Sequence, residues 1–194
     1  MATPVYLRRP QLYVFVAVGL VLASRELFVR RYLDAGLSRT DDRRSFWILW
    51  TATAIGTTVA LILPFSAVGN LPAPRGLFWL GIVVMLAGFA VRMVAVATLG
   101  ELFRHRIVLL ADHEVVERGP YGWVRHPAYS GAVLTYVGVG LACANWLSLV
   151  VVTAGALVGF GHRVRVEERV LRRELDGYEE YTERVPYRLV PFVW

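Results

Sequence analysis

The sequence contains no lysine, so all 21 of its basic residues are arginines. It has a single cysteine, Cys143, and no disulfide can therefore form within the chain. Charged residues are also scarce, at 19% against 56% hydrophobic residues, and they are nearly absent from several long apolar runs. These absences exclude a disulfide-stabilised secreted domain and favour a protein surrounded by lipid.

The net charge of +6 comes from arginines that lie between the apolar runs, which suits a membrane surface better than nucleic acid. Arg8 and Arg9 precede the first apolar run, as in a signal peptide. No small-residue cleavage site follows and further runs come after it, so we expect a retained first helix. Nothing in the sequence indicates nucleic acid or an obligate protein partner.

A membrane-spanning helix needs about 20 apolar residues. Three runs meet or approach this length, at 11–28, 46–68 and 77–99. With the runs described next, they predict an all-α fold: one membrane domain, 1–194, forming an integral membrane helical bundle of about five transmembrane helices. The segment 100–130 is expected to form a loop that carries the functional site.

The apolar stretch 131–161 is too long for one untilted span, and Asn145 and Trp146 interrupt it near its middle. A helical hairpin with a tight turn would satisfy the backbone within the bilayer. One long tilted helix is the alternative.

The arginine-rich segments follow the first and third runs and recur in the tail 162–194. Because cytoplasmic loops carry an excess of arginine, the N-terminus is expected outside and the C-terminus in the cytoplasm. Only Arg8 and Arg9 do not fit this orientation, because it places them outside. The tail predicts an amphipathic helix followed by an aromatic, interfacial end, and its aromatic residues are Tyr178, Tyr181, Tyr187 and Trp194.

Polar residues concentrate in two segments beside the apolar runs, where charge is expensive and usually has a function. The first runs from 113 to 131 and contains Gly119-Pro-Tyr121 and Arg125-His126-Pro127-Ala128-Tyr129. The second begins at Arg163 and continues to Glu167-Glu168. Arg163 and Glu167 are four residues apart and hence share one helical face.

Together these two segments resemble the signature of the isoprenylcysteine carboxyl methyltransferase family, over roughly residues 98–192. The resemblance implies S-adenosylmethionine as cofactor and a lipid-like substrate that enters from the bilayer. It places Arg163 on the acceptor's nucleophilic group and Glu167 on the cofactor, as the two catalytic residues. The remaining implied cofactor-binding residues are His113, Glu114, Val115, Val116, Gly119, Tyr121, Arg125, His126, Pro127, Ala128 and Tyr129. The resemblance also indicates a prokaryotic cell membrane, with the active site on the cytoplasmic side.

The chemistry of the residues agrees with this assignment. S-adenosylmethionine carries both charge signs, so Glu167 could face its cationic end while an arginine or histidine meets its carboxylate. A carboxylate or thiolate acceptor is already ionised and needs alignment more than a base. The planar guanidinium of Arg163 could hold a carboxylate at two points. Arg92 could line the substrate cavity, or it could snorkel to the membrane surface.

Simpler interpretations stay open for each motif. Arg125 could reflect only the positive-inside bias, His126-Pro127 could begin a helix, and Arg163 with Glu167 could be a surface ion pair. No histidine–cysteine spacing suggests a metal site.

Other functions fit part of the pattern. NADPH-dependent membrane sterol or enone reductases also carry an Arg-His-Pro-x-Tyr-x-Gly-like segment, but Gly119-Pro-Tyr121 and Glu167-Glu168 favour the methyltransferase. A non-catalytic scaffold would explain the spans but not the two polar motifs. Among methyltransferases, a phospholipid, another amine or a thiol is the alternative acceptor. An amine would require a base.

Overall fold

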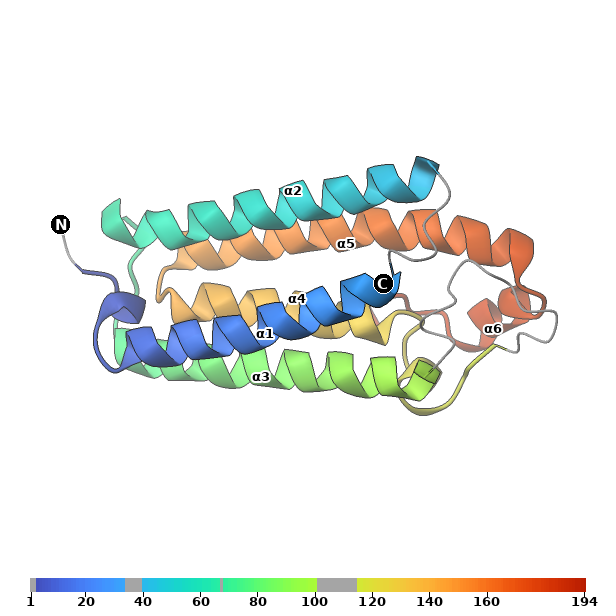
Figure 1. Ribbon diagram of the computed structural model, residues 1–194, viewed down its shortest axis with the longest axis horizontal. Coiled ribbons are helices and arrows are strands. Elements are labelled where there is room, and N and C mark those ends of the chain that lie inside the picture. Colours follow the sequence, from blue (N-terminus) through green and yellow to red (C-terminus); the bar gives the residue numbers. More distant parts are fainter. Residues whose placement is uncertain (1–2, 34–39, 67, 101–114) are drawn as a thin grey trace.

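The computed structural model describes residues 3–33, 40–66, 68–100 and 115–194, with backbone alone for 25–33 and 40–43. Every element in these ranges is helical (Figure 1). The α-helices are α1 (Gln11–Leu33), α2 (Thr40–Ile62), α3 (Pro74–Leu99), α4 (Pro127–Ala142), α5 (Trp146–Glu174) and α6 (Tyr178–Arg184). Three short 3-10 helices accompany them: η1 (Val5–Leu7), η3 (Leu63–Ser66) and η5 (Gly119–Gly122).

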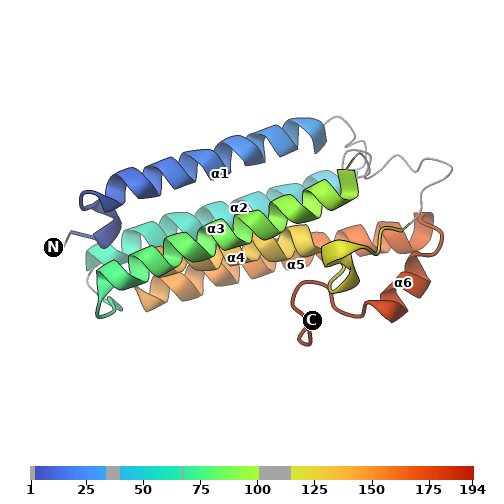
Figure 2. The ribbon, with the colours of Figure 1, turned by 90° about the horizontal axis from the view of Figure 1, so that it is seen from below.

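The five long helices, α1 to α5, lie side by side along one axis, and α6 lies at one end of them (Figures 1 and 2). Helices long and apolar enough to cross a membrane occupy Arg44–Ser66, Pro74–Leu99 and Trp146–Glu174, and α1 adds a shorter apolar part, Gln11–Ser24. Large apolar side chains such as Ile55, Val83 and Val158 point outward along the helices and are more than 60% exposed. The predicted all-α membrane bundle is thus confirmed.

Glycines bring α3 and α4 into backbone contact. A Cβ atom at Gly131 would lie 2.5 Å from the carbonyl oxygen of Gly88, and one at Gly81 would lie 2.4 Å from the nitrogen of Ala142. Small residues at such positions allow close packing of membrane helices, which have no hydrophobic driving force between them. This contact fixes the start of α4 against the end of α3, where the polar motifs lie.

The stretch 131–161 contains two helices, α4 and the first part of α5, joined at residues 143–145. The alternative of one long tilted helix is therefore wrong. Asn145 ends the turn: its side-chain oxygen accepts from the Ser148 N–H at 3.0 Å and caps α5. Its side-chain nitrogen donates to the Val68 carbonyl at 2.7 Å. These bonds tie residues 143–145 to residues 68–73, and we call this end of the bundle the turn end.

The helix α1 lies at the edge of the bundle (Figure 2), where Phe15 and Val18 pack against the buried Phe78 of α3. The predicted runs 11–28, 46–68 and 77–99 fall within α1, across α2 and its 3-10 extension, and within α3. The last helix, α5, continues 13 residues beyond 161 as charged helix, to Glu174.

Candidate active site at the end of the bundle

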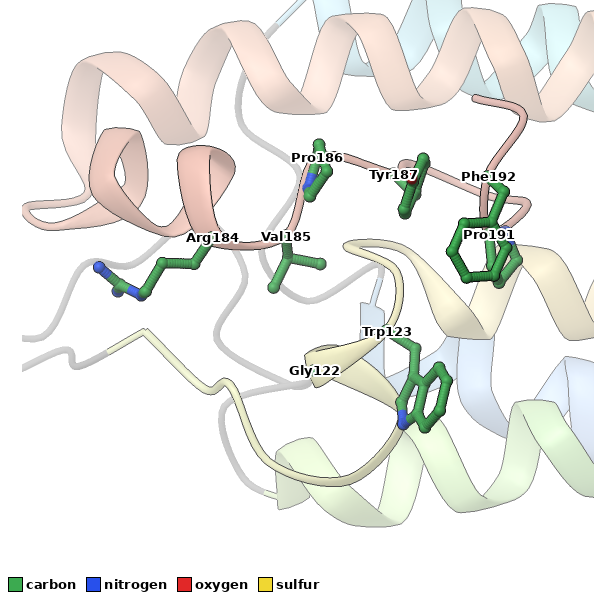
Figure 3. Close-up of a pocket in the computed structure, with 8 residues that line it drawn as sticks. All are labelled: Gly122, Trp123, Arg184, Val185, Pro186, Tyr187, Pro191 and Phe192. Atoms are coloured by element: carbon green, nitrogen blue, oxygen red, sulfur yellow. The ribbon is translucent and has the colours of Figure 1, made fainter.

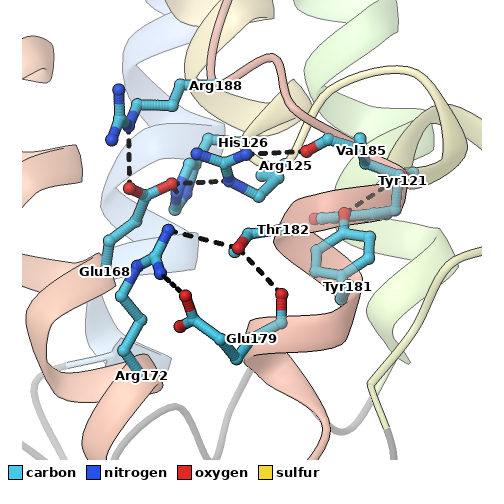
Figure 4. Close-up of polar contacts among 10 residues, drawn as sticks. All are labelled: Tyr121, Arg125, His126, Glu168, Arg172, Glu179, Tyr181, Thr182, Val185 and Arg188. Atoms are coloured by element: carbon cyan, nitrogen blue, oxygen red, sulfur yellow. Dashed lines mark hydrogen bonds and ion pairs between the residues drawn. The ribbon is translucent and has the colours of Figure 1, made fainter.

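The two polar motifs meet at the end of the bundle opposite the turn end. Residues 115–130, the charged part of α5, α6 and the C-terminal segment 185–194 come together there, and we call this the site end (Figures 1 and 4). Proline at the first position of α4, Pro127, fits a helix start because its missing N–H has no partner there in any case. His126 therefore serves as the N-terminal boundary of α4, but it is also part of a buried cluster.

At the centre of the cluster is Glu168, held between two arginines (Figure 4). The Nε atom of Arg125 lies 2.7 Å from one carboxylate oxygen and the Nε atom of Arg188 lies 2.7 Å from the other. The side chains of Arg125 and Glu168 are only 3% and 5% exposed, whereas that of Arg188 is 33% exposed. Two guanidinium groups around one carboxylate leave one net positive charge, which fits a site for an anionic group.

Arg125 also hydrogen-bonds to the backbone of the C-terminal segment. Its Nη1 donates to the Val185 carbonyl at 2.6 Å, and its backbone N–H donates to the Tyr187 carbonyl at 2.9 Å. The next N–H, that of His126, donates to the Arg188 carbonyl, also at 2.9 Å. The segment before α4 and the C-terminal segment are therefore joined by main-chain bonds, which place Arg188 over Glu168.

His126 is 2% exposed, yet neither of its ring nitrogens hydrogen-bonds to any residue that the structure describes. Its Nε2 is 3.4 Å from a Glu168 oxygen, close enough to be attracted when the ring is protonated. The ring stacks on that of Tyr129, with centroids 5.8 Å apart and planes at 11°. A buried polar group without a hydrogen bond is costly, so His126 is a candidate ligand-binding group.

Tyr178 is a second buried group of this kind. It is 4% exposed, and its hydroxyl has no hydrogen-bond partner among the described residues. Burial raises the pKa of this hydroxyl well above its ordinary value, and the negative charges of Glu168 and Glu167 raise it further. The hydroxyl therefore stays protonated and can donate a hydrogen bond to a ligand.

Glu167 and Arg163 point to different neighbours. An oxygen of Glu167 accepts from the Tyr129 hydroxyl at 2.8 Å, which places this carboxylate beside the start of α4. The Nη1 atom of Arg163 donates to the Ser45 hydroxyl of α2 at 2.7 Å. Arg163 thus lies between α5 and α2, whereas Glu167 faces α4.

Arg92 is 8% exposed and lies between α3 and α4, where its Nη1 donates to the Ala128 carbonyl at 3.0 Å. The predicted snorkelling of Arg92 to the membrane surface is therefore wrong, because the side chain is buried in protein. A carbonyl at the start of α4 is one of its partners. Its predicted role in lining a substrate cavity stays a prediction.

The remaining predicted residues have different surroundings. Val116, Tyr121 and Ala128 pack in one small apolar cluster, and Val115 packs against Tyr178 in another. Gly119 has the left-handed φ of +61° at the start of η5. His113 and Glu114 lie outside the described residues.

Sequence reasoning missed Arg188 and gave no role to Glu168. Both lie within the segments that carry the family resemblance. In the sequence, however, nothing distinguishes them from the other charged residues of the tail. The interaction that joins them spans 20 residues and a change of direction after α5. The tail also differs from its prediction, because Tyr178 and Tyr181 are buried rather than interfacial; the Tyr181 hydroxyl donates to the Tyr121 carbonyl at 2.7 Å.

These features define a multi-pass helical membrane protein with a buried, net positive polar cluster at one end of its bundle. Residues 79–173 match the model of the isoprenylcysteine carboxyl methyltransferase family. This region contains α4, most of α3 and nearly all of α5, and thus most of the cluster. The cluster therefore lies mostly within the part of the chain that is similar to this family.

Individual relatives agree. A probable protein-S-isoprenylcysteine O-methyltransferase from Oryza sativa subsp. indica is 36% identical over 118 residues, which are 59% of this chain and 61% of the rice protein. Protein-S-isoprenylcysteine O-methyltransferase from Saccharomyces cerevisiae is 34% identical over 117 residues, 59% of this chain and 48% of the yeast protein. Protein-S-isoprenylcysteine O-methyltransferase B from Arabidopsis thaliana is 28% identical over 146 residues, 72% of this chain and 74% of its own length. The chain spans less than two thirds of the rice and yeast relatives.

Proposed function

We propose that this protein is an S-adenosylmethionine-dependent methyltransferase that esterifies the carboxylate of a lipophilic, prenylcysteine-like acceptor. The observation that carries the proposal is the cluster of Arg125, Glu168 and Arg188 with His126, whose buried ring nitrogens make no hydrogen bond to the described residues. All of these residues except Arg188 lie inside the region that matches the family. The names of the relatives favour this reaction over NADPH-dependent reduction.

The residues at the site end fit the cofactor. The net positive charge around Glu168 suits the cofactor's carboxylate, and the buried ring nitrogens of His126 can accept or donate a hydrogen bond to its polar atoms. Glu167 offers a carboxylate to its cationic end. Val115 and Val116 could add backbone groups, as the family resemblance implies. When bound there, S-adenosylmethionine supplies an electrophilic methyl group on a sulfonium.

The acceptor side of the site is assigned to Arg163. Its guanidinium lies between α5 and α2, whereas Glu167 faces α4. A carboxylate held by Arg163 is already ionised, so the protein has to align it and exclude water rather than remove a proton. Ser45 orients Arg163 for this role.

The arginine distribution supports a cytoplasmic site end. The C-terminal ends of α1 and α3 and the charged part of α5 all lie toward the site end (Figure 1), and arginine-rich stretches of the sequence follow the apolar parts of these helices. The turn end carries Arg75 before α3 and the pair Arg8 and Arg9 before α1, but no longer arginine-rich segment. By the positive-inside bias, we place the site end and the C-terminus in the cytoplasm, where a soluble cofactor is available.

The first experiment is ligand-dependent stability of the purified protein in detergent. We expect S-adenosylhomocysteine to raise the melting temperature, since a ligand of the native state stabilises it by about 2.7 kcal/mol at 100 times its Kd. NADPH is expected to have no effect. Glu167→Ala and His126→Ala should each lose the response. Stabilisation by NADPH alone would move the protein to the reductases.

The acceptor is tested by transfer of a labelled methyl group to an S-prenylated cysteine with a free carboxylate. The matched control is the same compound with its carboxylate converted to an amide. A methyl ester releases labelled methanol in base, whereas an N- or S-methyl group does not. Base-stable label would contradict a carboxylate acceptor and favour the amine of the compound, because its sulfur is already alkylated.

A further inference from the structure

The turn at the end of the C-terminal segment exposes apolar side chains. Phe192 and Val193 are 80% and 77% exposed, and Phe192 has the left-handed φ of +66°. The N–H groups of Val193 and Trp194 both donate to the Val190 carbonyl, which closes the turn. Turn tips normally carry glycine or small polar residues, and a bulky residue at positive φ is strained. This tip is held in an unfavourable conformation that presents a phenyl ring outward.

Trp123 lies beside this tip. Its side chain is 70% exposed, and it faces Pro191 and Phe192 across a shallow cavity of about 130 Å³ (Figure 3). The floor of the cavity is formed by Pro186 and Tyr187 of the same C-terminal segment. Trp123, Phe192 and Val193 thus form one exposed apolar patch, which we call the tip patch.

The length of α4 fixes the depth of the tip patch. With 16 residues, α4 is about 24 Å long, shorter than the roughly 30 Å of a bilayer's hydrocarbon core. The turn that follows α4 leads directly to Trp146, which is 50% exposed and suits the far interface. The start of α4 therefore does not extend beyond the membrane interface at the site end. Trp123 comes only four residues before the start of α4.

The C-terminal segment lies at the same depth, because its carbonyls at Tyr187 and Arg188 accept from the N–H groups of Arg125 and His126. The tip patch is consequently level with the headgroup and glycerol region of the membrane that the helices cross.

We infer that the tip patch is a membrane-interface anchor, in which Trp123, Phe192 and Val193 insert among the phospholipids around the bundle. The occupant of the shallow cavity is then a lipid chain of the same bilayer. Insertion of Phe192 offsets the strain of its backbone by removing apolar surface from water. The anchor holds the C-terminal segment, and with it Arg188, at the level of the interface.

The test uses the full chain in phosphatidylcholine vesicles that carry a quencher at the headgroup, at a shallow chain position or at a deep chain position. The difference in fluorescence between wild type and Trp123→Phe isolates Trp123. We expect this difference signal to be quenched by the headgroup and shallow probes, weakly by the deep probe, and little by aqueous iodide. Trp146→Phe serves as the matched control at the other interface.

A second variant tests the tip itself. Phe192→Ser with Val193→Ser should shift the Trp123 signal toward iodide quenching in vesicles, while leaving the melting temperature in detergent unchanged. Trp123 that is quenched by iodide and by none of the lipid probes would overturn the anchor. So would a Trp123 that neither class of quencher reaches, because another protein surface would then cover the patch.

Discussion

At the turn end, Asn145 is 1% exposed and its side chain makes three hydrogen bonds, to Ser148, Val68 and Asn70. At the site end, His126 is 2% exposed and its ring nitrogens bond to none of the described residues. Both positions bury polar atoms at the edge of an apolar bundle, where each unsatisfied group costs free energy. The difference suggests different roles for the two ends. The hydrogen bonds of Asn145 stabilise the turn end, whereas the ring nitrogens of His126 are available to hydrogen-bond to a ligand at the site end.

The largest effect is expected from the centre of the site end. Glu168→Ala leaves the guanidinium of Arg125 buried without its carboxylate, and removing one partner of a buried ion pair costs about 3–5 kcal/mol of the free energy of unfolding. The measurement is equilibrium unfolding in mixed detergent. Glu179→Gln is the matched control, because Glu179 pairs with Arg172 at the surface and such pairs contribute at most about 1 kcal/mol.

If Glu168→Ala were no more destabilising than Glu179→Gln, the cluster would not be held as a unit. The buried charge would then have another partner or reach water, and the contrast between the two ends would have to be explained without it.

The next effect is expected at the turn end. Asn145→Ala removes the N-terminal cap of α5 and leaves the Val68 carbonyl without its donor, at a combined cost of about 2–3 kcal/mol. Because Asn145 lies at the far end of the bundle, the stabilisation by S-adenosylhomocysteine should persist in this variant. Loss of ligand response together with stability would show that the two ends are coupled and contradict their separation.

The sequence predicts the helices well because hydropathy reports burial in lipid directly. The runs at 11–28, 46–68 and 77–99 lie within a few residues of observed helices, and Asn145 marks the turn because a polar cap suits a helix start. The choice between Glu167 and Glu168 was beyond such reasoning. Neighbouring helical residues point about 100° apart, so which carboxylate enters the cluster depends on where α4 and Arg188 lie. Contacts over long sequence separations of this kind leave no periodic signal.

A smaller effect is expected from the buried tyrosine of the site end, and it depends on pH. The pKa of Tyr178 is raised in the folded state, so the stability it contributes is fully present below the ordinary pKa of about 10 and is lost as pH rises toward the folded value. Its share of the loss is at most about 1.4 kcal/mol per pH unit. Thermal unfolding between pH 9 and 11 should show a shallower decline for Tyr178→Phe than for wild type.

Tyr13→Phe is the control for that series, because Tyr13 is 56% exposed on α1. If both substitutions changed the slope of stability against pH equally, the loss of stability at alkaline pH would come from the overall charge of the protein and not from the burial of Tyr178.

The smallest effect on stability, and the sharpest test of the comparison, is expected from His126→Phe. The substitution keeps the stacking on Tyr129 and removes two buried nitrogens that have no partner among the described residues. We expect the free energy of unfolding to change by less than about 1 kcal/mol or to rise, while stabilisation by S-adenosylhomocysteine is lost. A cost equal to that of Asn145→Ala would make His126 a structural group like those of the turn end. Unchanged ligand binding at unchanged stability would contradict a role for His126 in holding the ligand.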